Sequence, residues 1–166
     1  ELGCDLFVDV RGKRLRAMFL YWGWRAAGGS DDEAVISAAA AMEFLQACAL
    51  VHDDVMDNSD SRRGRPAMHR QFRDLHETAE WAGDPANFGS AAAILISDRC
   101  LSWADEMLLS CGMDAPALLR GKPVYDVMRT ELMAGQYLDI LEQARGNDQV
   151  EPALQVARFK SAKYTI

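Results

Sequence analysis

The stretch that decides the fold reads Ser30-Asp-Asp-Glu-Ala-Val-Ile-Ser-Ala-Ala-Ala-Ala-Met-Glu-Phe-Leu-Gln-Ala-Cys-Ala-Leu-Val-His-Asp-Asp-Val-Met56. It contains no Gly or Pro and opens on a capping box, Ser30 to Glu33, so it predicts a single long helix. Its length exceeds 20 residues, which at about 1.5 Å per residue gives roughly 30 Å or more. Because Ser37, Glu43 and Gln46 interrupt the apolar run, a buried helix is favoured over a membrane span.

Similar patterns on both sides predict further helices, and strand signals are nearly absent. We expect a short piece near 115–119 and a break at Gly121-Lys-Pro123, where the next helix begins. A second capping box, Asp148-Gln-Val-Glu151, opens the last helix, which has no stop signal before Ile166. We therefore expect an all-α fold, with residues 1–166 forming one domain that continues beyond its C-terminal end. The other expected helices span about 11–27, 70–81, 88–109 and 123–145.

Composition narrows the class of protein. The chain has 166 residues, of which 49% are hydrophobic and 26% charged, and this profile predicts a soluble globular domain. The net charge of −7 argues against broad binding to nucleic acid or anionic membranes. The four cysteines form no Cys-x-x-Cys pair, so thiols in a reducing cytosol are expected. The first residues show no signal peptide, and we expect a cytoplasmic protein.

The end of the long helix carries a cluster of carboxylates. Asp53 and Asp57 are four residues apart and share one face of the helix, while Asp54 points about 100° away. Their mutual repulsion and the helix dipole both disfavour this arrangement. A hard cation such as Mg²⁺ would relieve both effects. The alternative is a solvated acidic helix end.

The residues around this cluster favour a binding site. Arg62, Arg63 and Arg65 follow closely, and carboxylates with Mg²⁺ and arginines form a diphosphate-binding arrangement. On the helix face below Asp53, the side chains are apolar and partly small. This face comprises Ala49, Gln46 and Met42, flanked by Cys48 and Leu45. The pattern describes a pocket for a charged head and an apolar tail, although ordinary core packing would give a similar stripe.

Five motifs in fixed order now resemble the trans-polyprenyl diphosphate synthases, the family of farnesyl and geranylgeranyl diphosphate synthases. They are Gly12-Lys-Arg-Leu-Arg16, Asp53-Asp-Val-Met-Asp57, Arg62-Arg-Gly-Arg-Pro66, Glu131-Leu-Met-Ala-Gly-Gln136 and Lys160-Ser-Ala-Lys-Tyr-Thr165. The resemblance implies an isoprenoid synthase-type helical bundle around a central cavity, usually as a homodimer. It also implies Mg²⁺-dependent condensation of isopentenyl diphosphate with an allylic diphosphate, which is dimethylallyl, geranyl or farnesyl diphosphate.

The resemblance assigns roles to individual residues. Asp53 and Asp57 would bind metal with Asp54 in support, and together with Lys160 they would be catalytic. Other assigned residues would bind the substrates. Arg62 would bind the allylic diphosphate, Lys160 and Ser161 its leaving group, and Lys13, Arg16, Gln46 and Arg63 the isopentenyl diphosphate. Gln136 and Asp139 would face the cavity.

The sequence departs from the family pattern at a few positions. Gln46 and Ser161 replace the usual His and Thr but can still form hydrogen bonds. The family has Gly where Arg11 stands and Pro where Ala17 stands, and residues are expected to be missing near Val10-Arg11. Three Mg²⁺ ions are expected in the family. The ligands of the third come from a second aspartate-rich motif, which does not occur before Ile166.

The length of the product can also be inferred from the resemblance. In this family, bulky residues just before the first aspartate motif stop chain growth early. Cys48 and Ala49 are small, which predicts a product of C20 or longer unless another helix closes the cavity. Met42, Leu45 and Met107 are the candidates for such a floor.

Three other functions remain open. A class I terpene cyclase shares the aspartate motif but does not need Lys13, Arg16 and Arg63. A catalytically silent diphosphate-binding subunit or fragment is favoured by the missing second motif. Arg63-Gly-Arg-Pro66 also matches an AT-hook core, but the neighbouring aspartates would repel DNA. We therefore expect no nucleic-acid partner and no membrane span.

Overall fold

The computed structural model describes residues 12–146 and 149–165, and within them the chain is all-α apart from one short hairpin. The expected all-α fold class is thereby confirmed. The elements are α2 (Leu15–Ala26), α3 (Glu33–Met56), β1 (Ser61–Arg62), β2 (Arg65–Pro66), α4 (Met68–Thr78), α5 (Pro85–Leu109), α6 (Ala115–Arg145), α7 (Val150–Val156), the π-helical segment η1 (Ala157–Ala162) and α8 (Lys163–Thr165). The suspected gap near Val10-Arg11 and the cap at Asp148 lie outside the described residues.

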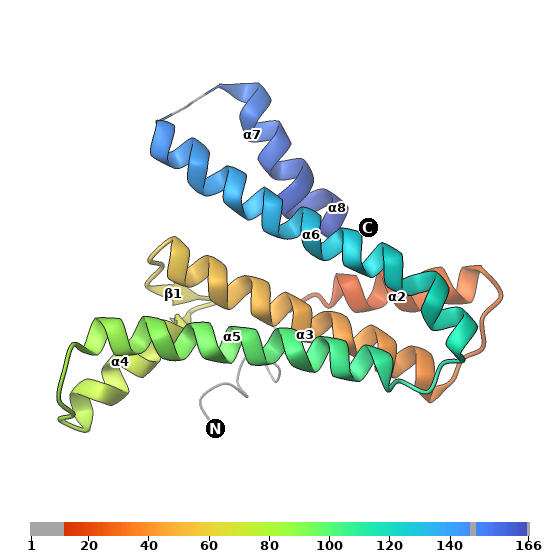
Figure 1. Cartoon of the computed structure of the whole chain (residues 1–166), viewed down its shortest axis with the longest axis horizontal. Helices are drawn as coiled ribbons and strands as arrows, with labels where there is room; N and C mark the ends of the chain where they lie inside the picture. Colours follow the sequence, from red (N-terminus) through yellow and green to blue (C-terminus); the bar gives the residue numbers. More distant parts are fainter. Residues whose placement is uncertain (1–11, 147–148, 166) are drawn as a thin grey trace.

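The long helix α3 lies at the centre of the molecule. It runs beside α5, which also packs against α4, while α2 packs on α3 (Figure 1). Helix α6 runs obliquely away from α3, and α7, η1 and α8 fold back along it. Since α3 and α6 both end on the left of Figure 1, their C-terminal ends lie on the same side of the molecule.

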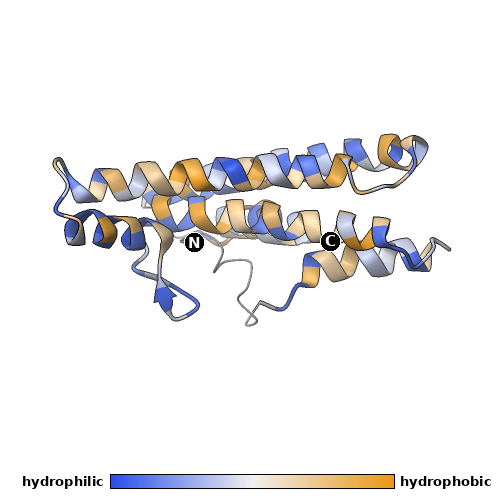
Figure 2. Ribbon diagram, turned by 90° about the horizontal axis from the view of Figure 1, so that it is seen from below, coloured by the Kyte–Doolittle hydropathy of each residue, from blue (hydrophilic) through white to orange (hydrophobic). Residues whose placement is uncertain are grey.

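The core lies mainly between α3 and α5, and the face that α5 buries is built from small side chains. Ala93, Ser97, Cys100 and Ala104 follow one another at spacings of three or four along α5 and are all fully buried. Small residues at this spacing let the two helix backbones approach closely. By length and composition alone, α3 could cross a membrane, but about half of its apolar stretch is buried inside the molecule. Figure 2 shows the hydrophobic residues on the helices and the strongly hydrophilic hairpin.

Two expectations about helix ends are wrong. Helix α3 is capped by Asp32, which accepts hydrogen bonds from the amides of Ala34 and Val35 at 3.1 Å each, and Ser30 instead donates to Asp32. Helix α6 does not break at Gly121-Lys-Pro123 but continues from Ala115 to Arg145. Pro123 lies on the exposed side, so its ring meets solvent and the helix gives up the one hydrogen bond that this residue cannot donate.

The segment η1 was not expected either. Its backbone packs so closely on α6 that a Cβ atom at Gly135 would lie 2.4 Å from the amide nitrogen of Lys160. Only glycine leaves room for this approach. A wider helical turn of this kind is typical of functional sites, and here it carries both Lys160 and Ser161.

Candidate functional site

The carboxylates at the end of α3 are bound by an arginine from the hairpin. Asp54 is 3% exposed, and the Arg62 Nε donates a hydrogen bond to its Oδ1 at 2.9 Å. The same guanidinium donates through Nη2 to Asp53 Oδ2 at 2.9 Å. The hydrogen bond to Asp54 raises the pKa of Arg62 despite burial, so the cation is held at the carboxylates in its charged form.

A second cation reaches Asp53 from the opposite side. Lys160 Nζ lies 2.8 Å from Asp53 Oδ1 and donates to Asp139 Oδ2 on α6 at 2.6 Å. Burial lowers the pKa of Lys160, but the hydrogen bonds to Asp139 and Asp53 outweigh it and leave the pKa raised. Burial likewise raises the pKa of Asp53, and Lys160 and Arg62 reverse this and leave it lowered. Asp53 is therefore an ionised carboxylate between two cations.

The hairpin sends neighbouring arginines in different directions. Its loop is Arg63-Gly64, and both residues have positive φ, 55° and 78°, which matches the twist of a two-residue hairpin. While Arg62 points to α3, the Arg63 guanidinium lies against Gly12, where a Cβ atom would be 2.9 Å from Arg63 Nη1. The sequence did not reveal this hairpin because its loop lacks the usual Asn-Gly or Asp-Gly.

A second polar cluster joins α2, α3 and α8. The Arg16 guanidinium lies 4.0 Å from the centre of the Tyr164 ring and donates to Thr165 Oγ1 at 3.0 Å. The Tyr164 hydroxyl donates to Gln46 Oε1 at 2.6 Å. Burial lowers the pKa of Arg16 and raises that of Tyr164. Tyr164 was missed as a site residue, although it lies inside the Lys160–Thr165 motif.

Between α3 and α6 lies a cavity of about 430 Å³, within the usual range for ligand pockets. Asp53, Lys160 and Ser161 line its charged end, and aliphatic side chains such as Leu50 and Ile140 line its body. The side-chain nitrogen of Gln136 is buried at this wall and lacks a hydrogen-bond partner among the described residues. The cavity thus combines a charged end with an apolar body.

The structure brings most of the expected site residues to this cavity. From α3 come Leu45, Gln46, Cys48, Ala49 and Asp53, and from the other elements Arg16, Gln136, Lys160 and Ser161. Met42 instead lines a neighbouring cavity of about 670 Å³, which shares Arg16, Leu45 and Tyr164 with the first.

The remaining expected residues lie at the edges of the site. Met107 packs against the core cluster that contains Met42. Lys13 is exposed, one residue after the glycine that contacts Arg63. Asp57 is exposed where α3 ends, and its amide donates to the Asp53 carbonyl at 2.8 Å.

Whether a metal ion fits here depends on the carboxylates. Among residues 12–146 and 149–165, no three His, Cys, Asp or Glu side chains are grouped closely enough to form a ready metal site. The donor chemistry nevertheless suits a hard cation, because Asp53 and Asp57 present oxygens one helical turn apart. Burial and the negative charge of Asp53 raise the pKa of Asp57, and a cation between the two would relieve this crowding. Asp53 and Asp57 are thus the residues that would hold Mg²⁺.

Comparison with known proteins assigns the family. The family model described as "Polyprenyl synthetase" matches residues 4–166. The chain belongs to this family. The resemblance inferred from the motifs is thereby confirmed.

Individual relatives of this polyprenyl synthetase chain support the same family assignment. It is 36% identical over 133 residues to the geranylgeranyl diphosphate synthase of Methanosarcina mazei. The aligned region covers 80% of this chain and 36% of the relative. The chain is 34% identical over 132 residues to the geranylfarnesyl diphosphate synthase of Natronomonas pharaonis, covering 80% of this chain and 34% of the relative. The chain thus spans about a third of the length of these curated relatives.

The fold of the polyprenyl synthetase chain also matches solved structures. The geranylgeranyl pyrophosphate synthase of Corynebacterium glutamicum, in complex with isoprenyl diphosphate and magnesium, superimposes with a TM-score of 0.87 and 44% identity. The match covers 93% of this chain and 45% of that one. Since most of this chain takes part, the match extends across the helices that build the cavity.

Proposed function

We propose that this chain belongs to a trans-prenyltransferase that condenses isopentenyl diphosphate with an allylic diphosphate. The allylic substrate is dimethylallyl, geranyl or farnesyl diphosphate, and the product is a linear polyprenyl diphosphate of C20 or longer. The observation that carries the proposal is the cavity between α3 and α6, which has Asp53 and Lys160 at one end and aliphatic walls along its body. A prenyl diphosphate has the same division into a charged head and an apolar tail.

In the proposed reaction, the bond between the allylic carbon and oxygen breaks, and diphosphate leaves with the electron pair. The double bond of isopentenyl diphosphate attacks the resulting cation, and the departed diphosphate then takes up the proton whose loss forms the new double bond. Lys160 and Arg62 hold fixed positive charge where the leaving diphosphate develops negative charge, which favours ionisation. Bound Mg²⁺ would neutralise further diphosphate charge at Asp53 and Asp57. The aliphatic walls keep water from the allylic cation.

The second substrate has a separate place in this proposal. Arg16 and Gln46, already joined through Tyr164, would bind the isopentenyl diphosphate together with Lys13 and Arg63. The contact of Arg63 with Gly12 supports this assignment, because it brings cations from the hairpin and from the segment before α2 to one region. Gln136, with its unpaired side-chain nitrogen, would donate to a bound substrate.

We further propose that the protein is a cytoplasmic homodimer, as the family resemblance implies. Exposed apolar side chains on α5 support a subunit contact, because Ile94, Leu95 and Trp103 are all more than a third exposed. Covering apolar side chains of this size with a second subunit lowers the free energy of the assembly.

The experiment that tests the function is incubation of the purified protein with Mg²⁺, isopentenyl diphosphate and farnesyl diphosphate, with products identified by mass. We expect an elongated prenyl diphosphate that is lost when EDTA is added. Binding of diphosphate without any product would contradict the proposal and favour a silent subunit. A hydrocarbon formed without incorporation of isopentenyl diphosphate would instead identify a terpene cyclase.

The position of Ala49 gives a prediction about product length. Ala49 lines the cavity, so Ala49→Phe should fill part of it and shorten the product by at least one C5 unit. Ile36→Phe, on the same helix but 50% exposed, is the matched control and should leave the product unchanged. Both are read by mass spectrometry of the products. An unchanged product length in Ala49→Phe would exclude this cavity as the path of the growing chain.

A further inference from the structure

The end of the cavity far from Lys160 contains an arginine. Among the lining residues on α3 and α6, Leu45 and Arg129 are the farthest along the helices from Asp53 and Asp139, and Leu101 of α5 packs against the cluster that contains Leu45. Arg129 precedes Asp139, the partner of Lys160, by ten residues, which is about 15 Å along a helix. A charged side chain that is partly buried in a pocket wall is costly unless it is paired.

Those partners are present and come from two helices. Arg129 Nη1 donates to both carboxylate oxygens of Asp105 on α5 at 2.8 Å, and Nη2 donates to Asp126 on α6 at 2.6 Å. Burial lowers the pKa of Arg129, but the hydrogen bonds to Asp126 and Asp105 outweigh it. Displacing the guanidinium would leave three strong hydrogen bonds unmade. The group therefore links α5 and α6 through Asp105, whose side chain is 37% exposed.

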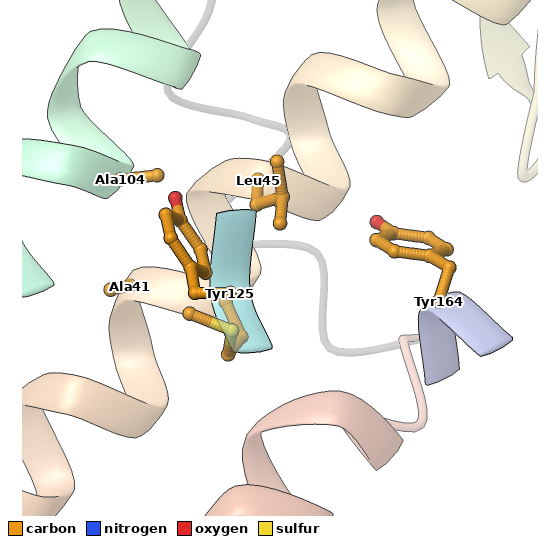
Figure 3. Packing of buried hydrophobic residues seen from close by; sticks show 6 residues of the cluster. Ala41, Leu45, Ala104, Tyr125 and Tyr164 are labelled. Carbon is orange, nitrogen blue, oxygen red and sulfur yellow. The ribbon is translucent and has the colours of Figure 1, made fainter. Parts of the chain in front are cut away.

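Beneath Arg129 there is packed protein. Its guanidinium lies 4.4 Å from the centre of the Tyr125 ring, and Tyr125 is 5% exposed. Figure 3 shows Tyr125 among Ala41, Leu45 and Ala104, which belong to the same buried cluster. A ligand that extends down the cavity on the side of Arg129 therefore meets a planar group backed by the buried Tyr125, where added volume would force overpacking. On the side of Leu45, the cavity borders the neighbouring cavity of about 670 Å³.

We propose that Arg129, held by Asp105 and stacked on Tyr125, forms the floor of the prenyl-chain cavity and sets the greatest chain length that the cavity accepts. The proposal rests on the proposed function and adds the residue that limits the chain. The small residues Cys48 and Ala49 leave the upper cavity open, while the limit is imposed lower down by α5 and α6. Of the candidates Met42, Leu45 and Met107, Leu45 lines the same end of this cavity as Arg129.

Arg129→Met tests this proposal, with Lys122→Met as the matched control. Both variants remove from α6 a cation that pairs with Asp126, but Lys122 lines neither cavity described above. With isopentenyl and farnesyl diphosphates, Arg129→Met should lengthen the main product by at least one C5 unit. Lys122→Met should give the wild-type product. Arg129→Lys, which keeps a charge for Asp105 but not the planar group, provides a second variant with a smaller expected shift.

A binding experiment tests the floor without turnover. Calorimetry with linear alkyl diphosphates of increasing length should give affinities that rise by about fourfold per buried methylene and then level off in the wild-type protein. In Arg129→Met, the rise should continue to longer chains. If folded Arg129→Met and Arg129→Lys keep the wild-type plateau and product, the floor assignment is wrong while the proposed function stands. If wild-type protein forms no product but shows the plateau, the function fails and the floor remains. Wild-type protein that binds no alkyl diphosphate would overturn both.

Discussion

Asp53→Asn should lower the rate of prenyl transfer on the order of a hundredfold to a thousandfold, the usual cost of removing one group that organises charge in a transition state. Asparagine keeps the size of the side chain but removes the charge that pairs with Lys160 and Arg62. It also removes one of the two carboxylates proposed to hold Mg²⁺. The measurement is kcat/KM for the allylic diphosphate at a fixed Mg²⁺ concentration.

Asp60→Asn is the control for this substitution. Asp60 lies in the same acidic segment, but its side chain is 90% exposed and pairs with Arg70 at 3.1 Å. Exposed pairs of this kind contribute little, so the variant should retain wild-type kinetics. Equal losses in the two variants, or a loss below about threefold in Asp53→Asn, would rule out a special role for Asp53.

The loss of stability caused by Asp53→Asn should also depend on pH. Because the folded protein lowers the pKa of Asp53, the ionised carboxylate stabilises the fold at neutral pH. This contribution is lost as the pH falls through the lowered pKa. The difference in free energy of unfolding between wild type and Asp53→Asn should therefore shrink in acid. A constant difference across the pH range would contradict the ion pairs at this carboxylate.

Gly135→Ala is expected to destabilise the protein by about 1–3 kcal/mol, the typical cost of overpacking, and to impair catalysis as well. The added Cβ would lie 2.4 Å from the amide nitrogen of Lys160 and 2.7 Å from the carbonyl carbon of Phe159. Both atoms belong to backbone, so η1 must move away from α6. Lys160 would then shift relative to Asp53 and Asp139, which α3 and α6 hold in place.

Gly121→Ala is the matched control on the same helix. A Cβ atom there would meet no atom within 4 Å, so the variant should gain up to about 1 kcal/mol from the better helix propensity of alanine. Urea unfolding at equilibrium measures both changes, and the rate of product formation measures the shift of Lys160. If Gly135→Ala is as stable as Gly121→Ala, the close packing of η1 on α6 is not a constraint on the fold.

Local sequence was sufficient to predict the helix that carries the aspartates. The expected helix ended at Met56, as α3 does, because the segment has no breaker and polar residues follow it directly. The charged end and the apolar face of the site also follow from this helix alone, since residues three or four apart share a face. The grouping of Asp53 with Lys160, more than 100 residues apart, came from the family resemblance.

The features that the sequence left out depend on contacts between distant segments. The π-helical turn of η1 packs against Gly135 on another helix. The helix propensities of the residues in η1 cannot predict a contact with a distant segment. The floor at Arg129 needs Asp105 from α5, whose position follows from the packing of α5 on α3. Helix α6 continues through Pro123, although proline inside a helix removes one backbone hydrogen bond and crowds the carbonyl of the preceding turn.

The two-residue loop Arg63-Gly64 has a consequence for protein engineering. Two neighbouring residues, Arg62 and Arg63, place one guanidinium at the aspartates of α3 and the other against Gly12. Both placements depend on the geometry of this one turn. A side chain at Gly64 would strain that geometry, because φ there is 78°. A substitution in this turn that changes the affinity for the allylic diphosphate should therefore also change the affinity for isopentenyl diphosphate. In a library of variants at Gly64, we expect the two affinities to change together.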